Sequence, residues 1–150
     1  LYNRNINAEC FRCLVNSLHD GPTEDLRFAG CSIEDVSALG NYSLPHLKIF
    51  DLRHNNIQHI PSLEKYTNLE ELLLDGNSIG RQGCRSIANL LQNKSSYLRI
   101  LSLGSNDIDN EEAEMLADSL KHNTTLTHLT LVGNKIKEKG MRAFLMLLND

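Results

Sequence analysis

The residues best suited to acid–base chemistry gather between positions 51 and 75. They are Asp51, Arg53, His54, Glu71 and Asp75. Carboxylates beside a histidine can transfer protons when a fold brings them within hydrogen-bond distance. The segment contains no nucleophile elbow, no phosphate-binding glycine loop and no complete set of metal ligands. We therefore interpret these residues as the solvated face of a sheet and expect no enzyme active site.

A second chemical motif is the C-x-x-C sequence from Cys10 to Cys13. Such a pair can hold zinc or exchange disulfides. Zinc requires two further ligands, and the redox motif requires a thioredoxin-like βαβ unit, neither of which accompanies the pair. We therefore expect both cysteines to pack in the core, with no metal and no cofactor. The placement of all four cysteines, which include Cys31 and Cys84, suits the reduced thiols of a cytosolic or nuclear protein, and we expect a cytoplasmic location.

The elements that position these residues follow an internal repeat, L-x-x-L-x-L-x-x-N-x-I. Three consecutive copies match all five main positions: Leu69, Leu72, Leu74, Asn77, Ile79; Leu98, Leu101, Leu103, Asn106, Ile108; and Leu126, Leu129, Leu131, Asn134, Ile136. Earlier copies are Leu47, Phe50, Leu52, Asn55, Ile57, the weaker Thr23, Leu26, Phe28, Cys31, Ile33, and the fragment Leu1, Arg4, Ile6. Five positions repeated at fixed spacing indicate a stack of similar units.

These residues resemble the leucine-rich-repeat superfamily over essentially the whole chain. Successive copies of the motif are offset by 27, 24, 22, 29 and 28 residues. In the long repeats, apolar residues stand 8 and 12 positions after the motif isoleucine, which predicts helices with one buried face: Leu14 and Leu18, Ile87 and Leu91, Leu116 and Leu120, Phe144 and Leu148. Long repeats of this kind are similar to the ribonuclease-inhibitor-like subclass found in NOD-like receptors, Ran GTPase-activating proteins and tropomodulins.

The resemblance implies an α/β fold, a right-handed solenoid with a parallel concave sheet and convex helices, in a single domain over residues 1–150. In the second of the two short middle repeats Pro61 stands where a helix would run, and Gly40, Asn41 and Pro45 interrupt the first in the same way. We therefore expect turns and a thinner convex side there. Leu1 enters in mid-repeat and no polar capping unit follows Phe144, so we expect a fragment of a longer array.

One position of each repeat is expected to be purely structural. A buried asparagine can both accept and donate hydrogen bonds to backbone groups of adjacent repeats. The expected ladder is Cys31, Asn55, Asn77, Asn106 and Asn134. Loss of Asn106 should cost about 1–3 kcal/mol. By contrast Asn123, expected in an ordinary loop, should tolerate alanine within about 0.5 kcal/mol.

The expected binding surface is the concave face, formed by strand residues that alternate with buried leucines. Its residues are Asp25, Arg27, Ile49, Asp51, Arg53, Glu71, Leu73, Asp75, Ile100, Ser102, His128, Thr130 and Val132. Four of them, Ile49, Leu73, Ile100 and Val132, are apolar where solvent is expected and could form one patch. An apolar centre with a charged border predicts a scaffold that binds a partner protein.

Composition narrows the alternatives. The net charge of -4 is spread along the chain, which argues against binding of nucleic acid. No apolar run reaches the roughly 18–20 residues of a membrane span. Sequons at Asn41, Asn93 and Asn123 leave open a secreted or cell-surface receptor ectodomain. Regulation of a small GTPase is a third alternative, implied by the resemblance alone. We expect a monomer or weak self-association through the uncapped ends.

Overall fold

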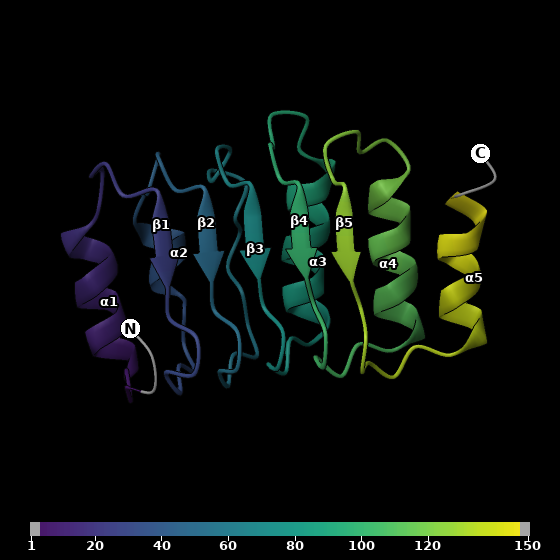
Figure 1. The fold of residues 1–150 in the computed structure, drawn as a ribbon, viewed down its shortest axis with the longest axis horizontal. Helices are drawn as coiled ribbons and strands as arrows, with labels where there is room; N and C mark the ends of the chain where they lie inside the picture. The colour runs from purple at the N-terminus through teal and green to yellow at the C-terminus, as the bar shows by residue number, and fades with distance from the viewer. Residues whose placement is uncertain (1–3, 148–150) are drawn as a thin grey trace.

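The structure, a computed structural model, describes residues 4–147 and has one sheet of five short strands. The strands are β1 (Asp25–Arg27), β2 (Ile49–Asp51), β3 (Glu71–Leu73), β4 (Ile100–Ser102) and β5 (His128–Thr130). All neighbours pair in parallel, and their order in the sheet is their order in the chain. Figure 1 shows the strands side by side with α2 and α3 behind them. The predicted α/β leucine-rich-repeat solenoid is confirmed.

The helices differ in length in the way that the repeat lengths predict. The long repeats carry α1 (Ala8–Ser17), α3 (Arg81–Gln92), α4 (Asn110–Leu120) and α5 (Glu138–Leu147). The first short repeat has only the single turn α2 (Ala38–Asn41), and no helix lies between β2 and β3. The buried Tyr66 fills part of this thin region, and its hydroxyl donates to the carbonyls of Leu39 and Tyr42 at 2.8 and 3.0 Å.

The core begins with the central residue of each strand. Leu26, Phe50, Leu72, Leu101 and Leu129 occupy one register row and point toward the helices. The first four are buried, because neighbouring strands lie on both sides or α1 lies close by. Leu129 is only half-buried, since no described strand covers the outer side of β5. Each repeat therefore depends on its neighbours to bury its leucines.

Helix starts and close contacts fix the long repeats. Asp109 caps α4 in a capping box, accepting from the Glu111 backbone N–H at 2.8 Å while Glu112 reaches back to the Asp109 N–H at 3.3 Å. At Gly140 a Cβ atom would lie 3.0 Å from both the Ala113 Cβ and the Asn110 Cα. Glycine thus lets α5 approach the first turn of α4.

The structure corrects the prediction for α1. Cys10 and Cys13 are exposed, whereas Phe11 and Val15 are completely buried. The Phe11 ring meets the Phe28 ring edge-on at 5.7 Å between centroids. The inward face of α1 is therefore rotated from the predicted stripe, and Leu14 is only half-buried. Leu1 and Leu148, which belong to other predicted positions, lie outside the described residues.

The asparagines of the repeat connect successive turns at the edge that follows the strands. The Asn55 Oδ1 atom accepts from the N–H groups of Cys31 and Ile33 at 3.0 and 2.9 Å. Its Nδ2 atom donates to the carbonyls of Phe28 and Leu52 at 2.9 and 2.8 Å. Asn77, Asn106 and Asn134 make the same kind of two-way bonds to their own and the preceding repeat.

Candidate functional site

The strand register places the outward side chains of the concave face in three rows. The first row is Asp25, Ile49, Glu71, Ile100 and His128, and the second is Arg27, Asp51, Leu73, Ser102 and Thr130. Two residues after the second row, in the segments that follow β2, β3 and β5, a third set contains Arg53, Asp75 and Val132. All predicted concave residues therefore come from the strands or from the two residues after them.

Asp51 departs from the prediction that it faces solvent. Its side chain is 0% exposed, and it lies beneath Arg53, whose side chain is 38% exposed. The guanidinium grips both carboxylate oxygens, with Nε to Oδ1 at 2.9 Å and Nη2 to Oδ2 at 2.7 Å, and the Arg53 backbone N–H also donates to Oδ1 at 3.1 Å. A partner can reach Arg53 but not the Asp51 carboxylate, so Asp51 is a supporting residue of this face.

The pKa of Asp51 reflects these contacts. Burial raises the pKa, because it disfavours the charged carboxylate, but the hydrogen bonds from Arg53 and the positive charges of Arg53 and Arg27 act in the opposite direction. The net result is a lowered pKa. Asp51 is thus held as an anion whose charge Arg53 compensates.

Most of the remaining charges on the concave face also have partners within the chain. Arg27 binds Asp25 through Nε at 2.9 Å and through Nη2 at 3.1 Å. The Asp75 Oδ1 atom accepts from the Gly104 backbone N–H at 2.8 Å, across to the next repeat. A short sequence signal marks the ion pairs: the D-x-R pattern occurs at Asp25–Arg27 and again at Asp51–Arg53. Residues two apart on a strand share a face, which allows this pairing.

Three of the four predicted apolar residues lie near one another. Ile49 and Ile100 flank Glu71 in the first row, and Leu73 follows Glu71 on the same strand and the same face. All three apolar side chains are half-buried. Val132, which is 78% exposed, lies beyond the end of β5 and is not beside Ile100, whose partner on β5 is His128. We call Ile49, Glu71, Leu73 and Ile100 the central cluster.

The predicted acid–base residues have different surroundings in the structure. Asp51 is sealed by Arg53, and Asp75 is bonded to backbone. His54 lies past the end of β2, exposed, in a left-handed backbone conformation with φ of 55°. Within residues 4–147 no three His, Cys, Asp or Glu side chains are grouped so that they could hold a metal ion.

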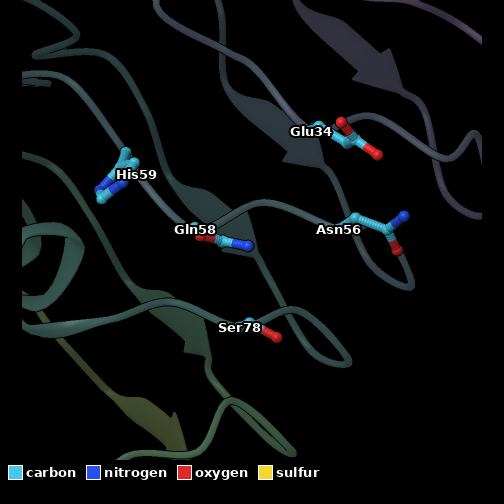
Figure 2. Close-up of a pocket in the computed structure, with 5 residues that line it drawn as sticks. All are labelled: Glu34, Asn56, Gln58, His59 and Ser78. Carbon is cyan, nitrogen blue, oxygen red and sulfur yellow. The ribbon is translucent and has the colours of Figure 1, made fainter.

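A polar hollow at the edge that follows the strands was not anticipated from the sequence. Figure 2 shows its lining residues, Glu34, Asn56, Gln58, His59 and Ser78, on the segments that follow β1, β2 and β3. A usable signal is that four of the five stand directly beside a motif isoleucine. All five side chains are exposed, and they contain no buried, precisely held group of the kind that binding pockets use.

A second set of asparagines, at the edge that precedes the strands, was also missed. Asn68, Asn93 and Asn123 each donate through Nδ2 to a carbonyl of the preceding repeat, those of Pro45, Glu64 and Leu91, at 2.7, 3.0 and 2.8 Å. The Asn123 Oδ1 atom also accepts from the N–H groups of Thr125 and Leu126 at 3.1 and 2.8 Å. The expectation that Asn123 occupies an undemanding loop position therefore does not fit the structure.

Comparisons with known proteins give one consistent result. Family profiles described as leucine rich repeat match residues 25–79, 94–117 and 122–145, which together are more than half of the chain. NACHT, LRR and PYD domains-containing protein 13 of Homo sapiens is 33% identical over 105 residues, which are 67% of this chain and 10% of that protein. NACHT, LRR and PYD domains-containing protein 5 of Bos taurus is 36% identical over 74 residues, which are 49% of this chain and 7% of that protein.

A shorter relative supports the same subclass. The ribonuclease inhibitor of Sus scrofa is 28% identical over 119 residues, which are 79% of this chain and 24% of the inhibitor. The chain thus spans at most about a quarter of the length of these relatives. None of the helices within residues 4–147 has the length and apolar character needed to cross a bilayer. The repeat motif, the parallel sheet and the profile matches lead to one assignment: the chain belongs to the leucine-rich-repeat family, with long repeats of the ribonuclease-inhibitor-like kind.

Proposed function

We propose that this chain is a non-catalytic scaffold that binds a partner protein through its concave face. The observation that carries the proposal is the central cluster, where Ile49, Leu73 and Ile100 hold apolar surface open to solvent on three adjacent strands. The paired charges Asp25–Arg27 and Arg53–Asp51 border it. An apolar centre bordered by polar groups is the usual build of a protein-binding surface.

The relatives support this type of function without naming a partner. The name ribonuclease inhibitor describes a protein that acts on another protein, and leucine-rich-repeat units provide a sheet on which strand residues can be varied without touching the core. In this chain, the outward strand positions with solvent-exposed surface include those of the central cluster together with Arg27, Ser102, His128 and Thr130.

A paired comparison of variants tests the proposal. A Leu73→Asp, Ile100→Asp double variant should fold, because both side chains face away from the leucine core, but it should lose the partner. The matched control carries Gln82→Asp and Arg85→Asp on the exposed side of α3 and should retain it. Binding is measured by mass spectrometry of the proteins captured with each variant, after circular dichroism has shown equal folding. Binding that survives the concave change and is lost with the convex one would contradict the proposal.

We also propose a cytoplasmic location. All four cysteines are free, and Cys31 and Cys84 are buried, which suits a compartment that keeps thiols reduced. A glycan on Asn123 would occupy the Nδ2 atom that bonds to the Leu91 carbonyl, which weighs against the receptor alternative. Mass spectrometry of the protein isolated from its natural source should find Asn41, Asn93 and Asn123 unmodified. A glycan on any of them would contradict a cytoplasmic location.

A further inference from the structure

The central cluster contains an acidic side chain that the chain itself does not neutralise. Glu71 lies on β3, half-buried, and it has no hydrogen-bond or ion-pair partner for its carboxylate among the described residues. The strand register places Ile49 directly beside it on β2 and Ile100 directly beside it on β4. Neighbouring parallel strands are about 4.8 Å apart, so these three side chains form one contiguous surface.

The other charges on the concave face behave differently. The guanidinium groups of Arg27 and Arg53 are each bound to a carboxylate in their own strand segment, and Asp75 accepts a backbone N–H. Lys48, the cation closest in sequence to this row on β2, pairs with Glu24 at 2.9 Å. Arg27 and Arg53 are therefore each neutralised by a carboxylate of their own segment. Glu71, at the centre of the cluster, has neither a cation nor a hydrogen-bond donor as a partner for its carboxylate among the described residues.

An unpaired carboxylate between two isoleucines favours one kind of side chain on a partner protein. A cationic side chain with an aliphatic stem can lay the stem across Ile49 and Ile100 and bring its charge to Glu71. Arginine fits best, because its planar guanidinium can bind both carboxylate oxygens. Resting on the proposed function, we infer that the concave face anchors its protein partner through an arginine side chain seated on Glu71 between Ile49 and Ile100.

The anchor can be tested with single-residue probes and isotope-labelled protein. Methyl signals of Ile49, Leu73 and Ile100 are followed by NMR while the chain is titrated with Nα-acetyl-arginine amide. The matched probe is Nα-acetyl-citrulline amide, which has nearly the same shape but no charge, and the third is Nα-acetyl-glutamate amide. The arginine probe should shift the Ile49 and Ile100 methyls with an affinity about tenfold above that of the citrulline probe, as one charged hydrogen-bonded pair provides. The glutamate probe should cause no shift.

Two variants locate the effect. Glu71→Gln keeps the shape of the side chain and should abolish the preference for arginine over citrulline. Glu64→Gln removes the same charge from an exposed turn away from the sheet and should leave that preference unchanged. Equal affinities of the two probes for the unaltered chain, or a preference that survives Glu71→Gln, would overturn the anchor.

The outcomes separate this inference from the proposed function. Probes that all perturb the Ile49, Leu73 and Ile100 methyls equally would overturn the arginine anchor while leaving the concave face as a binding surface. Shifts confined to methyls of the convex helices, such as Ile87 and Met115, would overturn the anchor and count against the concave face as well. Loss of partner binding in the Leu73→Asp, Ile100→Asp variant remains the independent measure of the proposed function.

Discussion

Each asparagine of the ladder serves two repeats at once. The Asn106 side chain is 0% exposed, and it donates to the Leu74 carbonyl of the preceding repeat and to the Gly104 carbonyl of its own. Its Oδ1 atom accepts from the Ile79 N–H at 3.2 Å. The motif alone was sufficient to identify this position, because a fixed asparagine after a buried strand has few other tasks.

We predict that Asn106→Ala lowers the free energy of unfolding by about 1–3 kcal/mol, because it leaves buried backbone groups without partners. Asn123→Ala should now cost about 1–2 kcal/mol for the same reason, since its side chain holds three backbone groups. Urea denaturation measures both. Asn89→Ala is the control: Asn89 is exposed on α3 and should change stability by less than about 0.5 kcal/mol. A cost for Asn123→Ala no larger than that of the control would show that its bonds are replaced by water.

Asp51 shows what strand alternation cannot predict. The alternation correctly assigns Asp51 to the outward row, but it gives no information on the exposure of a side chain that its neighbours cover. Arg53 closes over the Asp51 carboxylate, whereas the Asp25–Arg27 pair on β1, which stands two residues earlier in the strand register, leaves Asp25 46% exposed.

The lowered pKa of Asp51 predicts a pH-dependent stability difference. A carboxylate with a lower pKa in the folded state stabilises that state above the unfolded-state pKa of about 3.9 and loses this contribution as pH falls through the folded-state value. Asp51→Asn should therefore be less stable than the unaltered chain at pH 6, and the difference should shrink as pH falls below about 4. Urea denaturation between pH 2.5 and 6 gives both curves. A stability difference between the two proteins that stays constant from pH 2.5 to 6 would contradict the conclusion that the Asp51 carboxylate has a lowered pKa in the folded chain.

At the scale of elements, the repeat length predicts where helices form. The offsets of 29 and 28 residues accommodate α3 and α4, respectively, while the offset of 22 residues leaves no helix between β2 and β3. The rotation of α1 was not predictable from the same spacing. Phe11 and Val15 are buried in place of Cys10 and Cys13, because the Phe11 ring packs directly against Phe28. Counting 8 and 12 positions from the motif isoleucine does not show which neighbouring apolar side chain will pack most deeply.

The capping box of α4 gives a prediction for a single element. Asp109→Ala should lower the free energy of unfolding by about 1 kcal/mol, because the first turn of α4 loses an acceptor for the Glu111 N–H. Asp109→Ser, which keeps an oxygen at the cap, should lose only a few tenths of a kcal/mol. Thermal and urea denaturation would compare them. Equal losses in the two variants would mean that the negative charge of Asp109, and not its capping bond, stabilises the helix.

For the whole molecule, stability depends on stacking. Leu98, Leu101 and Leu103 are 0% exposed in the fourth strand segment, whereas their counterparts Leu126, Leu129 and Leu131 are half-buried. The motif predicts both sets to face inward, but their burial is a property of the neighbouring repeat and not of the residues themselves. The arrangement of the concave face also depends on neighbouring repeats, since the register between β4 and β5 places His128, and not Val132, beside Ile100.

Amide hydrogen exchange should reveal this gradient in the 150-residue chain. Backbone amides of β5 and α5 should exchange faster than those of β3 and β4, because local opening of the last repeat exposes less buried surface. NMR or mass spectrometry gives the rates for each segment. Uniform protection from β3 to β5 would show that the chain unfolds only as one cooperative unit.

The two sets of asparagine bonds, one at each edge of the sheet, also determine how the chain should respond to tension. Asn106 and Asn123, for example, fasten the segments before and after α4 to the preceding repeat at the two edges. Within residues 4–147 each strand pairs only with the strands next to it in sequence. Pulled from its two ends, such a chain should lengthen in steps, each step releasing one repeat of 22 to 29 residues. At about 3.4 Å per residue this is roughly 75–100 Å of extended chain for every pair of fastenings that breaks.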